Sequence, residues 1–368
     1  MPAVVVTGAD GFIGRTLCLR LSEAGYEVRK ILSASTREDL RQSLTNADAV
    51  VHLAGVNRPA DPADFMTGNR DSVVELISAL RASGQKTSVV LASSAQAVNG
   101  TAYGESKLAG ERALLDFAQA EGVTAHVLRL PNVFGKWCRP NYNSAVATFV
   151  HNIARDLPIT VNDPEARLSL VYVDDVATTI IDLIRAGPVD AGFRTVEPVY
   201  DTTVGEVADL VRRFHSDRGQ ALIDQVGSGL SRALYATYIA ALPTTAFSYP
   251  LVANADPRGV FCEVLKTRTS GQFSFLTAHP GVTRGGHYHH TKVEKFVIVQ
   301  GVARFRFRHV LTQEVREITT SGDHPEVVET IPGWTHDITN VGDGVMISLL
   351  WANEIFCPEE PDTIFEKV

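Results

Sequence analysis

The sequence lacks the features expected of a secreted or membrane protein. It has 4 cysteines in 368 residues, far apart and without a CxxC pair, which is typical of reduced thiols and not of disulfides or a cysteine zinc cage. No apolar run is long enough to span a membrane, and the first residues, MPAVVVTG, contain no charged leader or cleavage site. No block of basic residues occurs, and the formal net charge is −8. We therefore expect a cytoplasmic protein that binds neither nucleic acid nor membrane.

What is present indicates two folded domains. The chain is 45% hydrophobic with a mean hydropathy of +0.02, which is ample material for buried cores. Up to about residue 240, apolar strands alternate with amphipathic helices, which predicts an α/β fold with a doubly wound, Rossmann-type parallel sheet. Beyond residue 245, short β-rich runs alternate with turns, which predicts a small all-β barrel. We place the two domains at 1–243 and 244–368.

A glycine-rich loop follows the first predicted strand. In TGADGFIG, Gly8 permits a tight turn, Gly11 lets the backbone approach a pyrophosphate, and Gly14 allows close packing of helix on strand. The alternative is a plain strand-to-helix turn without a ligand. The predicted cofactor contacts are Gly8, Asp10, Gly11, Phe12, Ile13 and Gly14, joined by Leu53, Ala54 and Gly55 after a later strand.

The end of the second predicted strand bears on the choice of cofactor. An acidic residue there would bind the ribose hydroxyls of NAD, but the residues are Ser33-Ala34-Ser35-Thr36-Arg37. Arg37 and the hydroxyls could meet a 2′-phosphate, so we favour NADP(H), the alternative being a solvated loop arginine. The segment from here to Asp48 is too short for another strand and crossover of usual size, so we expect the sheet to lack one strand.

A tyrosine and a lysine are spaced for one face of a helix. Tyr103 and Lys107 are four residues apart in TAYGESKLAG, and Ser94 ends a predicted strand. A neighbouring ammonium lowers the pKa of a phenol, which makes Tyr103 a candidate general acid, and Ser94 could hold a substrate carbonyl oxygen. A surface pair is the alternative when such spacing occurs alone.

Four residues of the C-terminal half form a candidate metal site. His287 and His289 share one face of a predicted strand in HYHHTKVEKF, Glu294 follows, and His336 lies in IPGWTHDITN. Imidazoles with one carboxylate suit Zn²⁺, which we prefer, or Mn²⁺, Fe²⁺ or Ni²⁺. The alternative is a histidine base without a metal. His290 has the opposite parity and is expected to be a proton carrier or a surface residue.

These motifs resemble two known families. TGxxGxxG, a strand-end serine, YxxxK and a later VDD segment (171–177) resemble the extended short-chain dehydrogenase/reductases, although Ser94 and Tyr103 are only nine residues apart. The histidine segments resemble the two cupin motifs, except that Glu326 replaces the first glycine of the second motif. The first resemblance implies that tyrosine exchanges a proton with the substrate oxygen and that lysine holds the nicotinamide ribose. The second implies a cupin, a double-stranded β-helix barrel.

Chemistry suggests why both sites share one chain. A stereocentre beside a ketone can be inverted because the carbonyl acidifies its C–H, and a metal ion polarises that carbonyl further. Reduction of the ketone removes this acidity. An epimerase must therefore act first and a reductase second, and joining them limits release of a reactive keto-sugar.

The whole chain resembles the CapF/WbjC family of capsule and O-antigen biosynthesis through HLAGVNRP (52–59), FGKWCRPNYNS (134–144), FSYPLVANADPRG (247–259) and HYHHTKVEKF. This resemblance implies that the cupin epimerises C-3 of a UDP-2-acetamido-2,6-dideoxy-4-hexulose. The first domain would then reduce the C-4 ketone with NADPH to UDP-2-acetamido-2,6-dideoxy-L-talose, on the route to UDP-N-acetyl-L-fucosamine. It also implies a zinc-containing homodimer.

The same resemblance assigns roles to residues. Tyr103, Lys107 and Ser94 would serve the reductase. The segment NVFGKWCRPNYNS (132–144) would line the sugar-nucleotide side, with Asn132, Lys136 and Arg139 as contacts, the alternative being a structural loop. Candidates for the epimerase base are Lys292, His290 and Asp337. Two other functions remain open: a 4-keto-sugar reductase whose zinc cupin is only structural, and a metal-dependent oxygenase or isomerase with a degenerate first half.

Overall fold

The structure is a computed structural model that describes residues 1–187 and 190–368. These residues form two compact units, each described here by itself. The N-terminal unit comprises Met1–Val211 and Gly229–Leu242, and the C-terminal unit comprises Arg212–Ser228 and Pro243–Val368. The sequence-based division after residue 243 assigned the segment Arg212–Ser228 to the first domain, whereas this segment groups with the C-terminal unit.

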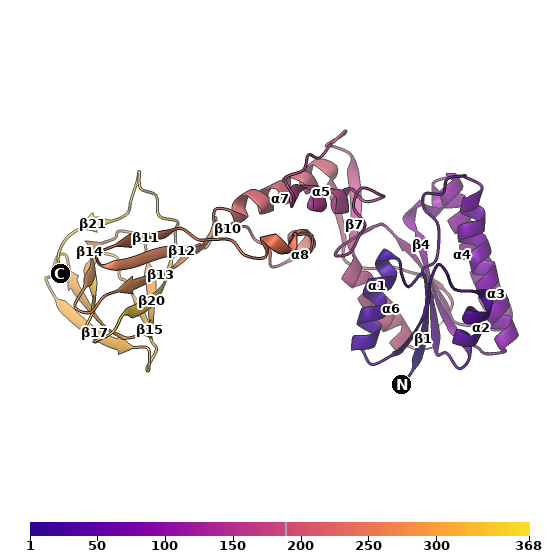
Figure 1. Ribbon diagram of the computed structural model, residues 1–368, viewed down its shortest axis with the longest axis horizontal. Coiled ribbons are helices and arrows are strands. Elements are labelled where there is room, and N and C mark those ends of the chain that lie inside the picture. The colour runs from indigo at the N-terminus through magenta and orange to yellow at the C-terminus, as the bar shows by residue number, and fades with distance from the viewer. Residues whose placement is uncertain (188–189) are drawn as a thin grey trace. The chain divides into compact units, whose positions relative to one another are not determined.

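A parallel sheet lies at the centre of the N-terminal unit (Figure 1). Its strands are β1 (Ala3–Thr7), β2 (Glu27–Ile31), β3 (Ala49–His52), β4 (Ser88–Ser94), β5 (Ala125–Leu130) and β8 (Gly192–Arg194). They are ordered β2-β1-β3-β4-β5-β8, and all neighbouring pairs are parallel. In a doubly wound sheet of order 3-2-1-4-5-6, two strands lie on the outer side of the first strand. Within the described residues, β2 alone lies on that side of β1. The prediction of one missing strand is confirmed.

Helices cover both faces of this sheet (Figure 1). On one face lie α1 (Phe12–Glu23) and α6 (Val173–Arg185), and on the other lie α2 (Arg37–Leu44), α3 (Ser72–Ser83) and α4 (Ala102–Glu121). Strand β1 is apolar and buried along its whole length because helices pack on both of its sides. Leu17 and Ile180 fill the first interface, and Leu76 and Leu114 fill the second. The predicted Rossmann-type fold is confirmed.

A smaller sheet and further helices complete the N-terminal unit. The sheet consists of β6 (Asn132–Phe134), β7 (Arg167–Tyr172) and β9 (Val199–Thr203), with β6 parallel and β9 antiparallel to β7. The remaining elements are η1 (Met66–Asp71), η2 (Ala95–Val98), α5 (Ala145–Ile153), α7 (Val204–Arg218) and α8 (Gly229–Ala240). Helix α7 continues past Val211 into the C-terminal unit.

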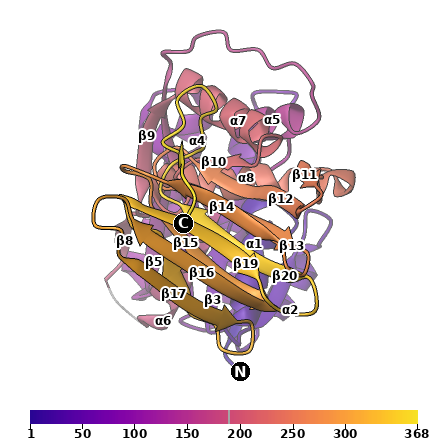
Figure 2. The same ribbon diagram turned by 90° about the vertical axis from the view of Figure 1, so that its left-hand side faces the viewer.

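The C-terminal unit consists largely of strands in two sheets, in which neighbouring strands are antiparallel except for the parallel pair β10 and β12 (Figure 2). One sheet contains β10 (Leu222–Ile223), β12 (Gly259–Thr267), β13 (Gly271–Ala278), β20 (Met346–Ala352), β15 (Glu294–Gln300) and β18 (Val327–Glu329), with β11 (Ala253–Asp256) on β12. The other contains β17 (Val315–Ser321), β16 (Val302–His309), β19 (Trp334–Asn340), β14 (Thr283–Tyr288) and β21 (Ile364–Phe365). The short helix η3 (Thr244–Ala246) precedes them.

Side-chain alternation builds the core between these two sheets. In β16, Ala303, Phe305 and Phe307 are buried and alternate with arginines, as expected of a strand with one face inward. They pack with Phe296 of β15 and Ile338 of β19, so both sheets contribute to one cluster. The predicted all-β C-terminal region is confirmed.

Candidate active site and candidate metal centre

Glycines shape the loop after β1 by leaving no room for side chains. Gly8 has a φ of +65°, and a Cβ at this position would lie 2.8 Å from the nitrogen of Ala54. A Cβ on Gly14 would overlap the Gly8 carbonyl oxygen and lie 2.8 Å from the Cα of Ala9. The backbone therefore packs closely against the first turn of α1, where the helix N-terminus favours an anion. This cradle fits the pyrophosphate of a dinucleotide.

A cavity of about 660 Å³ lies beside this loop, within the range usual for ligand sites. Most of the predicted cofactor and substrate residues line it, namely Gly8, Asp10, Gly11, Phe12, Ile13, Gly14, Leu53, Gly55, Ser94, Tyr103, Lys107, Asn132 and Arg139. Trp137 and Tyr142, in the segment expected on the sugar-nucleotide side, also line the cavity, as does Arg15, which was not singled out from the sequence. The fold thus brings the glycine loop, the serine and the tyrosine to one space.

Arg37, predicted to meet the 2′-phosphate of NADP(H), does not line this cavity. It begins α2, its side chain is 81% exposed, and its Nε lies 2.8 Å from Oε1 of Glu75 on α3. Beyond the end of β2, the Ser33 hydroxyl donates to the Asp10 carboxylate at 2.8 Å and lowers the pKa of that carboxyl. The pairing of Arg37 depends on how α2 packs beside α3, which local sequence does not reveal. Arg15, in the first turn of α1, lines the cavity instead.

Two other predicted contacts also lie outside the cavity lining. The Lys136 ammonium lies 2.6 Å from both carboxylate oxygens of Asp174, in the VDD segment. The Ala54 N–H donates to the Thr7 hydroxyl at 3.3 Å, so it joins the end of β3 to the end of β1. Lys136 is therefore held by an ion pair, whereas Asn132 and Arg139 remain on the cavity wall.

Ser94 and Tyr103 meet even though only nine residues separate them. Ser94 ends β4, and its side chain hydrogen-bonds the phenol of Tyr103 on α4. The intervening chain is compacted into η2, which packs tightly on α4 because residue 104 is glycine: a Cβ there would overlap the Gln96 carbonyl oxygen. Thr101 caps α4 by accepting the Gly104 N–H at 3.1 Å. The short loop therefore still brings the two hydroxyls together.

Burial controls the protonation of Tyr103 and Lys107. It raises the pKa of Tyr103, and the hydrogen bond with Ser94 acts in the opposite direction. This result corrects the predicted lowering by Lys107, since desolvation of the phenolate is the largest influence. Burial also lowers the pKa of Lys107 to about 8, although the negative charge of Glu111 acts to raise it. Near neutral pH, Tyr103 is therefore protonated and can donate to a carbonyl oxygen beside a charged lysine.

Glu111 is a neighbour of this site that sequence reasoning missed. It lies one turn after Lys107 on α4 and is 1% exposed. Its carboxylate accepts the Ser93 hydroxyl at 2.5 Å and the Arg129 guanidinium at 2.6 Å. Its negative charge raises the pKa of Lys107, against the effect of burial. The signal was available, because an acid four residues after a helical lysine lies on the same face.

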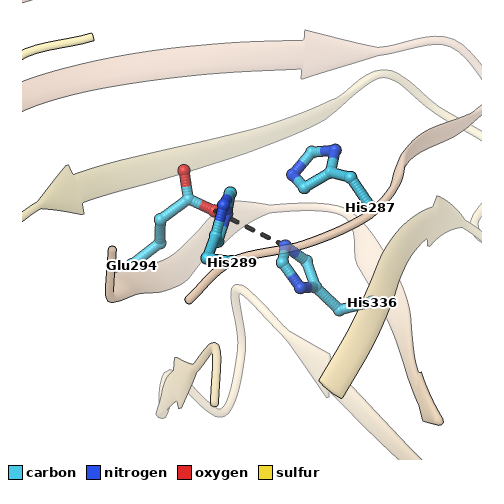
Figure 3. A group of neighbouring side chains, drawn as sticks. All are labelled: His287, His289, Glu294 and His336. Atoms are coloured by element: carbon cyan, nitrogen blue, oxygen red, sulfur yellow. Dashed lines mark hydrogen bonds and ion pairs between the residues drawn. The ribbon is translucent and has the colours of Figure 1, made fainter. Parts of the chain in front are cut away.

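The four predicted metal ligands lie together (Figure 3). His287 is on β14 and pairs in register with His336 on β19, while His289 follows β14 and Glu294 begins β15. One ligand atom from each residue lies within 4.8 Å of the others. His289 Nε2 lies 3.3 Å from Glu294 Oε2, and His336 Nε2 lies 3.5 Å from the same oxygen. Three strands thus direct a three-histidine, one-carboxylate set to one point.

The electrostatics of this group suit a divalent cation. Burial lowers the pKa of His287 to about 4, so its imidazole is neutral near pH 7. Burial raises the pKa of Glu294, but the neighbouring His289, His336 and Lys292 outweigh it and hold the pKa well below its usual range. His336 Nε2 is buried without a hydrogen-bond partner among the described residues. A neutral imidazole, a carboxylate and a buried ring nitrogen that makes no hydrogen bond are the donors expected of a zinc-type site.

The three candidates for the epimerase base have different surroundings. Lys292 is 8% exposed, and its ammonium lies 3.5 Å from Glu294 Oε1, beside the candidate metal centre. His290 is exposed, with its ring 5.5 Å from that of Tyr288. Asp337 is buried and forms an ion pair with Arg306. Of the three, the structure places Lys292 next to the four predicted ligands.

The fold and these sites define a dinucleotide-binding enzyme unit joined to an antiparallel-sheet unit with a candidate metal centre. Within the described ranges, no helix has the length and apolar character to cross a membrane. Residues 4–192 match the NAD dependent epimerase/dehydratase family, and residues 254–364 match the polysaccharide biosynthesis C-terminal domain.

Full-length relatives narrow this class. The chain is 50% identical to a UDP-2-acetamido-2,6-beta-L-arabino-hexul-4-ose reductase of Pseudomonas aeruginosa, over 98% of this chain and 97% of that protein. The crystal structure of the capsular polysaccharide assembling protein CapF from Staphylococcus aureus is similar at 42% identity, with a TM-score of 0.93 and coverage of 99% and 100%. The chain belongs to the NAD dependent epimerase/dehydratase family, in the group that contains CapF. Membership implies a nicotinamide cofactor.

A more distant likeness concerns the fold alone. The UDP-glucose 4-epimerase of Thermus thermophilus, in complex with NAD, is 21% identical with a TM-score of 0.55. The match covers 65% of this chain and 98% of that one. This likeness agrees with the parallel-sheet architecture described above.

Proposed function

We propose that this protein is a bifunctional nucleotide-sugar enzyme. Its C-terminal unit, a zinc-containing cupin, epimerises C-3 of a UDP-2-acetamido-2,6-dideoxy-4-hexulose. Its N-terminal unit then reduces the C-4 ketone with NADPH to UDP-2-acetamido-2,6-dideoxy-L-talose, on the route to UDP-N-acetyl-L-fucosamine. The observation that carries the proposal is the gathering of His287, His289, Glu294 and His336 in a chain whose other unit holds Ser94, Tyr103 and Lys107 on one cavity. The full-length likeness to a 4-keto-sugar reductase and to CapF supports it. A homodimer and a cytoplasmic location stay predictions.

The reduction follows from the residues that line the N-terminal cavity. NADPH, when bound against the glycine loop, supplies the hydride. Tyr103 donates its phenolic proton to the C-4 oxygen, and burial keeps that proton in place near neutral pH. Ser94, hydrogen-bonded to the phenol, orients the same oxygen. The charged Lys107 beside Tyr103 stabilises the phenolate that remains after the transfer.

The epimerisation follows from the groups around the metal centre. A Zn²⁺ ion held by His287, His289, Glu294 and His336 would supply Lewis-acid polarisation of a carbonyl. Lys292, at 3.5 Å from Glu294, is the nearest candidate to move the C-3 proton, with His290 as the exposed alternative. Because only the ketone acidifies C-3, this step precedes reduction.

The test is proton NMR of a candidate UDP-4-keto sugar in heavy water, without NADPH. We expect the wild-type protein to introduce deuterium at C-3. Tyr103→Phe should leave this exchange running while it slows reduction by about 10²- to 10⁴-fold, the usual contribution of a general acid. His289→Ala should stop the exchange, while a 4-ketone whose C-3 is already inverted is still reduced. Absence of exchange in wild-type protein saturated with zinc would contradict the proposal.

The same variants separate the alternatives. If the cupin is only a structural part of a 4-keto-sugar reductase, His289→Ala should lower the melting temperature and slow both activities together. A loss of exchange with an unchanged melting profile excludes that alternative. Oxygen uptake by iron-loaded protein would instead favour an oxygenase on an unrelated substrate.

A further inference from the structure

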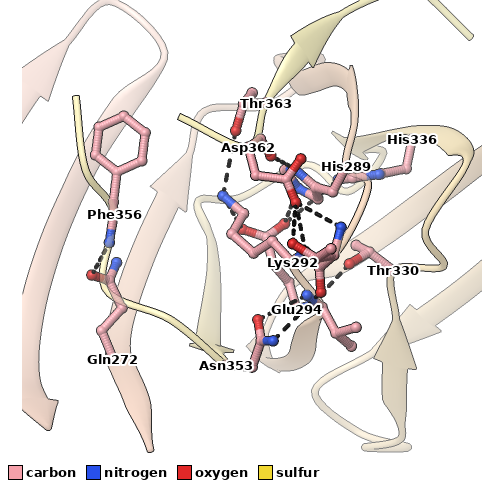
Figure 4. Close-up of polar contacts among 12 residues, drawn as sticks. Gln272, His289, Lys292, Glu294, Thr330, His336, Asn353, Phe356, Asp362 and Thr363 are labelled. Carbon is pink, nitrogen blue, oxygen red and sulfur yellow. Dashed lines mark hydrogen bonds and ion pairs between the residues drawn. The ribbon is translucent and has the colours of Figure 1, made fainter. Parts of the chain in front are cut away.

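We infer that Asp362, in the C-terminal tail, is a positioning residue for the candidate metal centre and fixes both the loop that carries its ligands and the orientation of His289. The inference rests on the proposed metal centre and adds to it a residue outside the four predicted ligands. Asp362 is 68 residues beyond Glu294 in sequence, so only the fold brings it to the site (Figure 4).

The loop between β14 and β15 has a backbone held by side chains. The N–H groups of His290, Thr291 and Lys292 donate to the Asp362 carboxylate at 2.9, 2.7 and 2.8 Å. The Thr291 hydroxyl donates to it as well, at 2.9 Å. A carboxylate that accepts several backbone N–H groups forms strong, charge-assisted hydrogen bonds. Asp362 therefore defines the path of the chain between His289 and Glu294.

The next two N–H groups complete this framework. Val293 donates to the Asn353 side-chain oxygen at 2.9 Å, and Glu294 donates to the Thr330 hydroxyl at 2.8 Å. Five consecutive N–H groups, from residue 290 to residue 294, thus donate to side-chain oxygens from three other places in the chain. Residues 289–293 lie outside the strands, so the path of this loop depends on these hydrogen-bond partners.

Asp362 also acts directly on a predicted ligand. Its backbone carbonyl oxygen is hydrogen-bonded to Nδ1 of His289. An imidazole that donates Nδ1–H to a carbonyl has its Nε2 lone pair free for a metal, and the bond fixes the ring plane. Nε2 of His289 does point to Glu294, 3.3 Å from Oε2. One residue thus sets the tautomer of His289 and the position of the loop that leads to Glu294.

The tail that carries Asp362 is itself anchored. Strand β21 pairs with β14, so that Phe365 lies opposite His287. The Glu366 N–H donates to the Gly286 carbonyl at 3.0 Å, and Arg308 of β16 donates to the Glu366 carboxylate at 2.6 Å. These contacts hold the tail to the same sheet that carries His287 and His336. The Asp362 carbonyl is therefore a fixed acceptor.

The experiment measures zinc binding by the full-length protein, using competition with a chromophoric chelator, and the visible spectrum of bound Co²⁺. The variants are Asp362→Ala, Asp362→Asn and the control Glu360→Gln, which changes an exposed acid of the same tail. Both Asp362 variants keep the backbone carbonyl that bonds His289 and change only the carboxylate that holds the loop. Loss of a group that supports metal ligands typically weakens metal binding about 10- to 100-fold. We expect this loss in Asp362→Ala, with an altered Co²⁺ spectrum. Asp362→Asn, which keeps the side-chain volume but offers one acceptor oxygen in place of two, should also bind zinc more weakly.

The outcomes are distinct. Glu360→Gln should bind zinc like the wild type. If folded Asp362→Ala and Asp362→Asn bind zinc with unchanged affinity and spectrum, the inference is wrong while the proposed function stands. If the wild-type protein itself binds no zinc, the proposed metal centre fails and this inference falls with it. Should Asp362→Ala not fold, the result with Asp362→Asn decides.

Discussion

Tyr103 and Lys107 are one helical turn apart, and burial shifts their pKa values in opposite directions. The phenol keeps its proton to higher pH, and the ammonium loses its proton at about pH 8. Glu111, the next residue on the same face of α4, reduces the lowering of the Lys107 pKa. A protonated Tyr103 beside a charged Lys107 is the state suited to reducing a ketone. This state is therefore present at neutral pH and is lost when the pH rises far enough to neutralise Lys107.

The pH dependence of reduction should show this limit. Because the pKa of Lys107 is lowered to about 8, its charge is present below that pH and is lost as the pH rises through it. We expect kcat/KM for ketone reduction to fall as the pH rises through about 8. In the Lys107→Arg variant the arginine stays charged throughout this range. Its kcat/KM should therefore not fall near pH 8, whether its overall rate is high or low. A wild-type profile that stays level through this range would contradict the assignment.

At the scale of elements, η2 and the first turn of α4 form one packed corner. The corner exists because Gly104 lets the Gln96 carbonyl approach the helix, and it places Ser94 against Tyr103. The glycine loop before α1 depends in the same way on Gly8 and Gly14. The shape of both corners of the N-terminal site therefore depends on glycines, which have no side chain to hold neighbouring backbone apart.

Gly104→Ala tests this packing. The added methyl group would overlap backbone, so η2 must shift and separate the two hydroxyls. A displacement of about 1 Å at a catalytic group can cost about 10²-fold in rate, and we expect a loss of this size in kcat for ketone reduction. Gly227→Ala is the matched control, because a Cβ there meets nothing within 4 Å. Equal rates for both variants would show that the corner does not position Ser94.

Local patterns predicted much of these elements, and the misses share one cause. Glycine spacing, strand alternation and the common face of His287 and His289 follow from short-range periodicity, whereas Glu294 and His336 were grouped with them through the resemblance to the cupin motifs, and the structure brings all four together. The pairing of Arg37 with Glu75 and that of Lys136 with Asp174 depend on packing between distant elements. Asp362 reaches the metal loop for the same reason. Sequence spacing holds no information about such contacts.

At the scale of the whole molecule, each unit has its own hydrophobic core and its own candidate site. The ligand set of the C-terminal unit and the cavity of the N-terminal unit share no residue. The two reactions should therefore be separable by removing what only one of them needs.

Metal removal is the direct way to separate them. Dialysis against a chelator should stop deuterium exchange at C-3 but not the reduction of a 4-ketone whose C-3 is already inverted. Zn²⁺ should restore the exchange, whereas Mg²⁺ should not, because it prefers oxygen ligands. Zinc at a hundred times its Kd should also stabilise the protein against unfolding by about 2.7 kcal/mol. Parallel loss of both activities on chelation would contradict two separate sites.

The central claim is that inversion at C-3 comes before hydride transfer to C-4. It is tested most directly by proton NMR of the product formed from the UDP-4-keto sugar with NADPH in heavy water. We predict a reduced sugar with deuterium at C-3 and protium at C-4. A reduced product that keeps protium at C-3 would contradict the claim.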